Sequence, residues 1–544
     1  MIHVQELTLS FGDRTLFKDV NITFKSGECY GIIGANGAGK STFLRILSGE
    51  IEPDRGSVTI PSGLRMAALK QDQSAFDDHS VLHTVIMGHP ELYRTMLERD
   101  AIYEKEDFSE EDGIRASELE AHFAELNGWE AESEAGQLLD GLGMSDDTLE
   151  LHMRELEPSL KVRVLLAQAL FGSPDILLLD EPTNNLDLES INWLEDFLYR
   201  FDNTVIVVSH DRHFLNKVCT QTADIDYGRI QLFPGNYDFW YESSQLMQKQ
   251  MRDQKKRTEE KASELKEFIQ RFSSNASKAK QATARKKLLD KLTIDDIKPS
   301  SRRFPYVHFK AERSCGDKVL EAEGIACNEE GEQVLPPFDI SVQPGDKIAF
   351  VGPMNRAKTL FFESIMGRRT PDAGSYNWGV TITPSYFPAD NSEFFREKMS
   401  LIEWLRQFSP DAEETYVRGF LGRMLFSGDE ALKSVTVLSG GEKVRCMLSK
   451  MMLQEGNVIV LDDPTNHLDL ESITALNNAL EEFPEVVMLN SHDHQLIESV
   501  ANRIIEFTPA GVIDRRMDFD EYVESEKIRT LRDELYHGHQ RVAI

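Results

Sequence analysis

Short apolar runs alternate with stretches of helical spacing along the chain, a pattern typical of an α/β protein. The runs Tyr30 to Ile33, Ile176 to Leu179 and Thr204 to Val208 have the length of strands buried in a parallel sheet. Residues 88–130 are more polar and carry apolar side chains at helical spacing, namely Leu92, Met96, Leu97 and Ile102, then Leu119, Phe123 and Leu126. We expect this second stretch to form a helical hairpin.

The chain also repeats itself. Residues 176–187 (ILLLDEPTNNLD) match residues 458–469 (VIVLDDPTNHLD) at an offset of 282, which also relates the Ser-His-Asp triplets at 209–211 and 491–493. Upstream, residues 34–41 match 352–359 at an offset of 318. The two offsets differ by 36 residues, so the first copy contains an insertion of that length, which we assign to the hairpin at about 88–130.

A basic segment separates the two copies. Residues 249–310 hold 18 Lys and Arg against 8 Asp and Glu, whereas the whole chain of 544 residues holds 60 against 92, a net charge of −32. Apolar spacing predicts two helices here, marked by Leu265, Phe268, Ile269 and Phe272, then by Leu288, Leu289 and Leu292. We therefore expect a first domain at 1–238, a basic helical hairpin linker at 239–312 and a second domain at 313–544.

Composition excludes several classes of protein. No run approaches the roughly 20 apolar residues of a membrane span, and Met1 to Glu6 lacks the features of a signal peptide. The five cysteines are scattered and include no CxxC pair, which argues against a disulfide framework or a zinc site. We expect a cytoplasmic protein with no membrane partner, whose acidic body disfavours general RNA binding while the linker permits it locally.

A glycine-rich loop follows the first apolar run. Gly34-x-x-x-x-Gly39-Lys40-Ser41 stands between a predicted strand and a predicted helix, the context of a phosphate-binding P-loop. The glycines let backbone N–H groups face phosphates, and the helix N-terminus adds partial positive charge. Lys40 can reach the β- and γ-phosphates, and Ser41 can ligate Mg²⁺. The predicted nucleotide-binding residues of this loop are Gly34, Ala35, Asn36, Gly37, Ala38, Gly39, Lys40, Ser41 and Thr42.

Two acids and a histidine follow the other two apolar runs. Asp180 is placed to hold Mg²⁺ through water, and Glu181 to act as the general base for an attacking water. His210 can bond the γ-phosphate and hold that water, and its repetition at His492 favours a functional role. A solvated pair of acids at the end of a strand is the rival interpretation, which the P-loop upstream makes less attractive.

A second anion site is predicted in the second copy. Leu438-Ser439-Gly440-Gly441-Glu442 precedes a helix expected to begin near Lys443. Ser439 is a typical N-cap residue, and the two glycines free backbone N–H groups ahead of the helix. Alone, such a loop is more often a plain helix cap, but its position shortly before Asp462 favours an anion site.

Together these motifs resemble the ATP-binding cassette superfamily. Its cassettes contain, in this order, a P-loop, a loop with a glutamine (Gln71 here), an LSGGE signature, a strand that ends in acids, and a histidine. Two cassettes joined by a charged linker resemble the ABC-F family of ribosome-associated ATPases, and the segments at 70–73 and 109–113 look closest to its bacterial YbiT-type subgroup. The resemblance implies two α/β cassettes stacked head to tail within one monomer. Each ATP would lie between the P-loop of one cassette and the signature of the other.

The resemblance further implies the partners and two site residues. Gln71 would be a ligand of Mg²⁺ and of water, and Phe11 would stack on adenine. The ribosome would be the partner, through large-subunit rRNA and tRNA. The linker would reach toward the peptidyl-site tRNA, and the inserted arm toward the large-subunit stalk near the tRNA exit site.

Head-to-tail stacking makes the two composite sites unequal. Site one joins the first P-loop to Ser439, Gly440, Gly441 and Glu442, and every motif is present. Site two keeps Lys358, Thr359, Asp462, Asp463 and His492. It departs from site one at four positions of its own cassette: Glu329 for Phe11, Asn355 for Gly37, Ala357 for Gly39 and Ala389 for Gln71. Glu329 would place an anion opposite a polyanion. The signature that faces site two contains Glu157 and Pro158 in place of a serine and glycines. We expect site one to hydrolyse ATP and site two to be degenerate, unless Asp463 still serves as a base.

The linker cations are the candidate RNA contacts: Arg271, Lys278, Lys280, Arg285, Lys286 and Lys287. No acid interrupts this set and small residues separate its members, which suits approach to a phosphate backbone, although a charge run on a helix is usually a solvated face. The expected function is an ATPase that clamps and releases the ribosome and modulates translation. The alternatives are the ATPase subunit of a membrane transporter and an ATP-gated binding module that does not hydrolyse.

Overall fold

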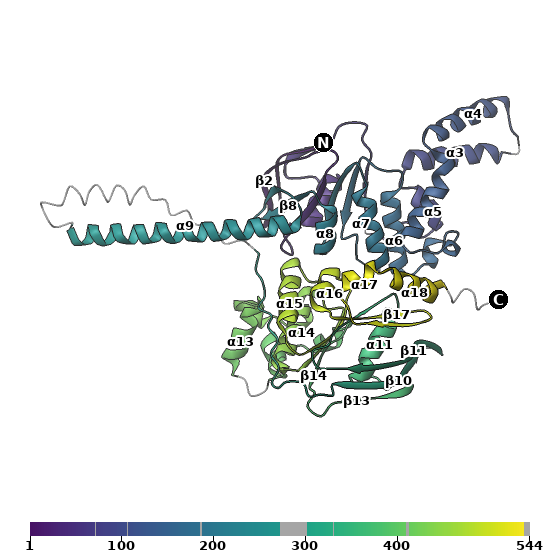
Figure 1. Ribbon diagram of the computed structural model, residues 1–544. Coiled ribbons are helices and arrows are strands. Elements are labelled where there is room, and N and C mark those ends of the chain that lie inside the picture. The colour runs from purple at the N-terminus through teal and green to yellow at the C-terminus, as the bar shows by residue number, and fades with distance from the viewer. Residues whose placement is uncertain are drawn as a thin grey trace.

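A computed structural model describes residues 1–12, 14–70, 72–105, 107–184, 186, 188–272, 302–329, 331–409 and 413–537. Two α/β units lie one above the other, the first uppermost in Figure 1, and their sheets have the same strand order. The expected fold class, two tandem P-loop cassettes, is confirmed.

The first cassette is built on a six-stranded sheet in which only the last strand is antiparallel to its neighbour. The order is β5 (Met66–Ala68), β6 (Ile176–Asp180), β7 (Thr204–Val208), β3 (Cys29–Gly34), β8 (Gln221–Asp226) and β9 (Arg229–Pro234). A smaller antiparallel sheet, β2 (Arg14–Phe24), β1 (Ile2–Phe11) and β4 (Arg55–Thr59), covers one face. Alternate residues of β6 pack on that sheet and on the helices opposite, which is why the whole strand is apolar.

The second cassette repeats this plan. Its large sheet has the order β14 (Pro384–Phe387), β15 (Val458–Asp462), β16 (Val486–Asn490), β12 (Lys347–Val351), β17 (Arg503–Thr508) and β18 (Gly511–Arg515). Its small sheet consists of β11 (Glu332–Val342), β10 (Leu320–Glu329) and β13 (Ala373–Trp378). The sequence repeat is therefore a repeat of structure.

Helices surround both sheets. Those of the first cassette are α1 (Lys40–Leu47), α2 (Val81–Ile86), α5 (Ala131–Gly141), α6 (Pro158–Leu170), α7 (Leu188–Tyr199) and α8 (Arg212–Val218). Those of the second are α11 (Asn355–Ile365), α12 (Leu401–Arg406), α13 (Glu414–Arg423), α14 (Gly440–Gln454), α15 (Leu470–Glu482), α16 (His494–Val500), α17 (Phe519–Glu524) and α18 (Glu526–His537). Among the described helices, none is long and apolar enough to cross a membrane.

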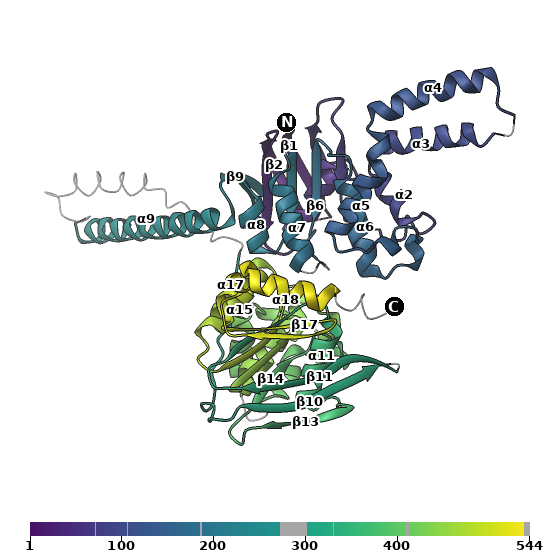
Figure 2. The same cartoon turned by 45° about the vertical axis from the view of Figure 1, so that its right-hand side comes forward.

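Two features project from the cassettes. The antiparallel pair α3 (Pro90–Tyr103) and α4 (Glu110–Glu125) lies within the range assigned to the insertion and extends from the first cassette in Figures 1 and 2. Pro90 starts α3, and a capping box of Ser109 and Asp112 starts α4. The long helix α9 (Tyr237–Phe272) extends to the other side. The second linker helix predicted at 288–292 lies outside the described residues.

The cassettes meet through their helices. Leu470, at the start of α15, packs in an apolar cluster that otherwise belongs to the first cassette. The helices α17 and α18 lie on the side of the second cassette that faces the first (Figures 1 and 2). Residues that follow β6 and β7 of the first cassette and β15 and β16 of the second lie close together at this contact.

Candidate active site between the two cassettes

The P-loop of the first cassette connects β3 to α1. Gly39 is the N-cap of α1 with φ of +102°, a conformation that L-residues rarely adopt, and the Lys40 ammonium donates to the Gly34 carbonyl at 2.9 Å. The first helical hydrogen bond runs from the Phe43 N–H to the Gly39 carbonyl. The N–H groups of Lys40, Ser41 and Thr42 therefore precede the hydrogen-bonded part of the helix, where they are available to phosphate oxygens.

The strand acid and the histidine meet beside this loop. Because β6 and β7 are adjacent and parallel, Glu181 and His210 lie at the same edge of the sheet. Glu181 has φ of +52°, its carboxylate lies 3.3 Å from His210 Nε2, and it accepts the His210 backbone N–H at 3.1 Å. Burial raises the pKa of Glu181, opposed by the Lys40 ammonium, while burial lowers the pKa of His210 to about 3. A basic carboxylate therefore faces a neutral imidazole.

The second cassette supplies the opposite wall. Ser439 is the N-cap of α14, its side chain accepts from the Glu442 N–H, and the Glu442 carboxylate accepts the Ser439 N–H at 2.8 Å. The helix starts at Gly440, three residues before the position expected, because this capping box fixes its first turn. Glu442 also pairs with Lys433 at 3.1 Å, so its carboxylate is engaged with its own cassette.

A cavity of about 1040 Å³ lies between these walls and contains parts of both composite sites. It brings together most predicted residues of site one: Asn36, Gly37, Gly39, Lys40, Ser41, Thr42, Glu181, His210, Ser439, Gly440 and Gly441. From site two it includes Asp463 and His492. Described residues that were predicted but do not line it are Phe11, Gly34, Ala35, Ala38, Asp180, Glu442, Lys358, Thr359 and Asp462.

Several predicted residues need separate placement. Phe11 is 54% exposed at the end of β1, where its register partner is Arg14. The Arg14 guanidinium donates to the Gly37 carbonyl of the P-loop at 2.8 Å. Gln71, Lys278, Lys280, Arg285, Lys286 and Lys287 lie outside the described residues. Of Arg271, near the end of α9, only the backbone is described.

The oxygen atoms beside the P-loop fit Mg²⁺. Ser41 lines the cavity, and Asp180 ends β6 at the same edge with one carboxylate oxygen buried. Hydroxyl and carboxylate oxygens are the ligands that this hard cation prefers.

The sequence did not single out the segments that follow the strand acids. Thr183, Asn184 and Leu186 in the first cassette, and residues 465–468 in the second, line the cavity. They belong to the same gap-free repeat as the acids, and this repetition could have marked them as site residues.

Site two has a differently folded P-loop. The helix α11 begins at Asn355, which aligns with Gly37, whereas α1 begins at Lys40. The Lys358 N–H already donates to the Met354 carbonyl at 3.2 Å, and Thr359 lies further inside the helix. Asn355 and Ala357 disfavour the positive φ values of Gly37 and Gly39, so the helix extends through the loop. Its hydrogen bonds use N–H groups whose counterparts precede the hydrogen-bonded part of α1 in site one.

The other parts of site two differ as well. Lys358 is fully buried and donates to the Gly352 carbonyl at 2.9 Å, and burial lowers its pKa to about 8. On the facing helix α6, Glu157 is the N-cap without a capping bond and Pro158 supplies no N–H. One reason given from the sequence is wrong: Glu329 does not present an unbalanced anion, because Arg356 and Arg369 pair with it at 2.5 and 3.1 Å.

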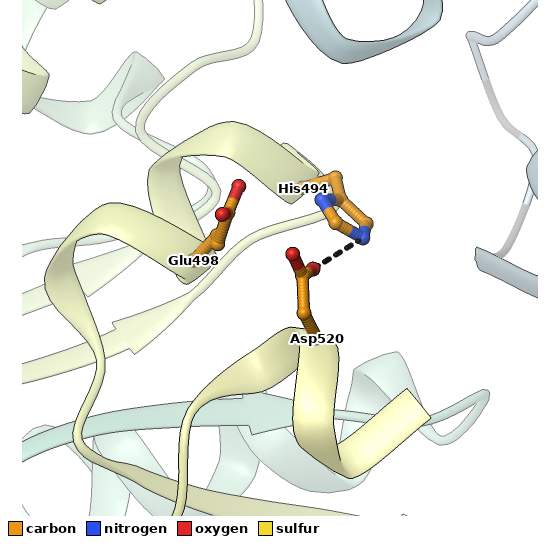
Figure 3. A group of neighbouring side chains, drawn as sticks. All are labelled: His494, Glu498 and Asp520. Carbon is orange, nitrogen blue, oxygen red and sulfur yellow. Dashed lines mark ion pairs between the residues drawn. The ribbon is translucent and has the colours of Figure 1, made fainter. Parts of the chain in front are cut away.

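A cluster of three ionisable side chains lies outside the cavity. His494 and Glu498 of α16 and Asp520 of α17 gather at the junction of the two helices, with atoms within 4.8 Å of one another and a 3.6 Å pair between His494 and Asp520 (Figure 3). The His494 ring stacks at 3.9 Å on His213 of the first cassette. This group is therefore part of the contact between the cassettes.

Comparisons with known proteins agree with this architecture. A family model described as ABC transporter matches residues 17–184 and 335–466, and a second model with that description matches 223–309. The chain is 59% identical to YkpA of Bacillus subtilis (strain 168), described as an uncharacterized ABC transporter ATP-binding protein, over 98% of this chain and 100% of that protein. It is 42% identical to YbiT of Escherichia coli O157:H7, a probable ATP-binding protein, over 97% and 100%.

Solved structures show the same fold at lower identity. One chain of a structure described as ribosome-bound archaeal Pelota and ABCE1 is 18% identical with a TM-score of 0.54, over 98% of this chain and 86% of that one. The tandem cassettes and the full-length match to YbiT identify the family. The chain belongs to the ABC-F family of tandem ATP-binding cassette proteins.

Proposed function

We propose that the chain hydrolyses ATP at site one and uses the ATP-dependent contact between its cassettes to clamp and release the ribosome. The observation that carries the proposal is the difference between the two P-loops. Site one keeps helix-terminal N–H groups facing the cavity, whereas the helix α11 uses the corresponding groups of site two. Site two then serves as a contact between the cassettes and not as a second centre of turnover.

The chemistry follows from the residues at the edge of the sheet. A water between Glu181 and the γ-phosphate attacks phosphorus while Glu181 takes its proton. The bond from phosphorus to the bridging oxygen breaks, ADP leaves with the electron pair, and inorganic phosphate forms. His210 is neutral and holds the water or the γ-phosphate by a hydrogen bond. Ser41, Asp180 and Gln71 would hold Mg²⁺, which neutralises charge on the β- and γ-phosphates.

Closure of the cassettes follows from the composite site. ATP bound to the P-loop of the first cassette offers its γ-phosphate to Ser439 and Gly441 of the second, so it binds the closed form more tightly than the open form. Hydrolysis removes that bridge and the cassettes separate.

Three observations support the ribosome as the partner. The linker is basic on an acidic protein, the α3–α4 arm projects from the first cassette, and one structural neighbour is described as ribosome-bound. In this proposal the linker cations contact rRNA or tRNA phosphates and the arm contacts the large subunit near the tRNA exit site.

Steady-state ATPase with and without ribosomes tests the enzymatic part. We expect the wild-type chain to turn over ATP and the Glu181→Gln variant to lose turnover while keeping ATP binding and sedimenting with ribosomes. Appreciable hydrolysis by Glu181→Gln would remove Glu181 as the base. Negligible wild-type turnover under both conditions would favour an ATP-gated binding module.

Ribosome co-sedimentation over a range of salt tests the linker. Glutamate at Lys278, Lys280, Arg285 and Lys286 should weaken binding and flatten its salt dependence. A control with the same charge change places glutamate at four exposed lysines of the cassettes, Lys18, Lys25, Lys318 and Lys398. Equal effects of the two quadruple variants, or unchanged binding by the linker variant, would contradict RNA contact by the linker.

A further inference from the structure

Arg302 joins the two cassettes at a buried position. Its guanidinium donates to the Asp224 carboxylate at 2.5 Å and to the Glu471 carboxylate at 2.7 Å, and its side chain is only 6% exposed. The guanidinium also lies over the Trp240 ring, 4.3 Å from its centroid. One side chain from the end of the linker thus holds an acid from each cassette.

Both acids stand next to site one. Asp224 lies in β8 and is paired in register with Ile33, in the strand that leads into the P-loop. Glu471 lies in the first turn of α15, two residues after Asp469. The charges of Glu471, Asp469 and Arg302 all act on the Lys40 ammonium, whose pKa is lowered by burial. The arrangement therefore fixes the start of α15 beside the phosphate-binding lysine of the opposite cassette.

The same arrangement occurs at site two with a different arginine. The offset of 282 relates Asp224 to Glu506, and Trp240 to Tyr522. Trp240 Nε1 donates to Asp224, and the Tyr522 hydroxyl donates to Glu506. Arg532 of α18 donates to Glu506 at 2.7 Å and lies 3.9 Å from Glu189, the counterpart of Glu471.

The two arginines are not counterparts in the repeat, because Arg302 precedes the second cassette and Arg532 lies in its last described helix. Cations from unrelated places in the chain thus occupy equivalent places in the fold. At site one both acids are largely buried, with side chains 15% and 4% exposed, so they need a positive charge between them. At site two Glu506 is buried, whereas Glu189 is 65% exposed. The bridge is tighter at site one, with a distance of 2.7 Å to the opposite cassette against 3.9 Å at site two.

We propose that Arg302 is a positioning residue for ATP hydrolysis at site one. By holding Asp224 and Glu471 together, it keeps α15 and the segment before it docked beside Lys40, and it makes the end of the linker part of the site-one contact. A shift of the linker at this point is then transmitted to the ATP site. This inference rests on the proposed function, since it concerns turnover at site one.

The test compares Arg302→Met, Arg302→Lys and the exposed neighbour control Arg303→Met in steady-state ATPase. We expect Arg302→Met to lower kcat about tenfold or more with a change in KM of no more than about threefold, because ATP binds mainly to the P-loop and the lost contact aligns the opposite cassette. Arg302→Lys should recover part of kcat, since an ammonium keeps the charge but reaches fewer acid oxygens. Arg303→Met should match the wild type.

A double-mutant cycle separates positioning from general damage. Glu471→Gln alone should lower kcat, and the double variant Arg302→Met with Glu471→Gln should be no worse than Arg302→Met. Unchanged kcat in Arg302→Met, or additive losses in the cycle, would overturn the inference. If Arg302→Met does not fold, the kcat of Arg302→Lys is compared with that of Arg303→Met. A lower kcat in Arg302→Lys would support the inference, and equal kcat values would overturn it. Absence of ATPase in the wild type would instead count against the proposed function.

Discussion

Replacing Gly39 by alanine tests whether backbone geometry in the P-loop sets ATP affinity. Gly39 has φ of +102°, and a Cβ there would lie 2.3 Å from Leu16 Cδ2 and 2.8 Å from Phe17 Cζ. Leu16 can move its terminal methyl, but the Phe17 ring is fully buried and packs on Phe43 of α1. The substitution therefore opposes the loop conformation through both the backbone and the packing.

The magnitude can be worked from these two costs. A non-glycine residue in such a region costs about 1–3 kcal/mol, and crowding of a packed core costs about 1–3 kcal/mol. The variant can avoid part of this by extending α1 through the loop, as α11 does with Ala357 at the same position. A net penalty of about 2 kcal/mol on the binding-competent loop corresponds to ATP binding weaker by about 30-fold, at about 1.4 kcal/mol per factor of ten.

The assay is equilibrium binding of ATP to chains that also carry Glu181→Gln, so that ligand is not consumed. The matched control is Ala357→Gly in α11, which should change ATP affinity less than threefold because that position is already helical. Circular dichroism checks that both variants fold. Unchanged affinity in a folded Gly39→Ala chain would refute the reasoning that the open loop is what holds ATP.

Other substitutions test the asymmetry and the cassette contact. Ser439→Ala removes the N-cap of α14, worth about 1 kcal/mol, and should lower ATPase several-fold, whereas Ser159→Ala on the facing side of site two should not. Asp463→Asn should leave ATPase within about twofold, and a tenfold loss would show turnover at site two. The hydrogen bond to Glu195 raises the pKa of His213 in the folded chain. The pair therefore contributes its full stabilisation of the fold below about pH 6.5, the pKa of a free histidine, and this contribution is lost as the pH rises through the pKa of the folded state. The melting temperature of the wild type should therefore fall more steeply above pH 6.5 than that of His213→Gln, and parallel curves would contradict this.

The sequence could predict the elements whose cause is local. The apolar runs at Ile176 and Thr204 became β6 and β7 because a strand buried on both faces must be apolar throughout. The start of α14 was misplaced by three residues, since two glycines suggest a loop while the reciprocal bonds of Ser439 and Glu442 favour helix.

The remaining features depend on segments that are distant in the chain. Nothing around Arg302 indicates that it lies between acids of both cassettes, because Asp224 and Glu471 are far away in sequence. Likewise, Asn355 and Ala357 signalled a damaged P-loop, but not that the helix would extend through it and leave Lys358 fully buried.

The counter-ions of the two P-loop lysines give a physical reason for the proposed asymmetry. Lys358 is balanced by Asp462, Asp463 and Glu506, all of its own cassette. Lys40 is balanced by Glu181 of its own cassette and by Asp469 and Glu471 of the other. Separation of the cassettes therefore changes the field at Lys40 but removes none of the acids that balance Lys358. The charge balance at site one therefore depends on closure of the cassettes, because part of it comes from the opposite cassette. The charge balance at site two does not, so the two cassettes can remain in contact at site two throughout the ATPase cycle and pivot there.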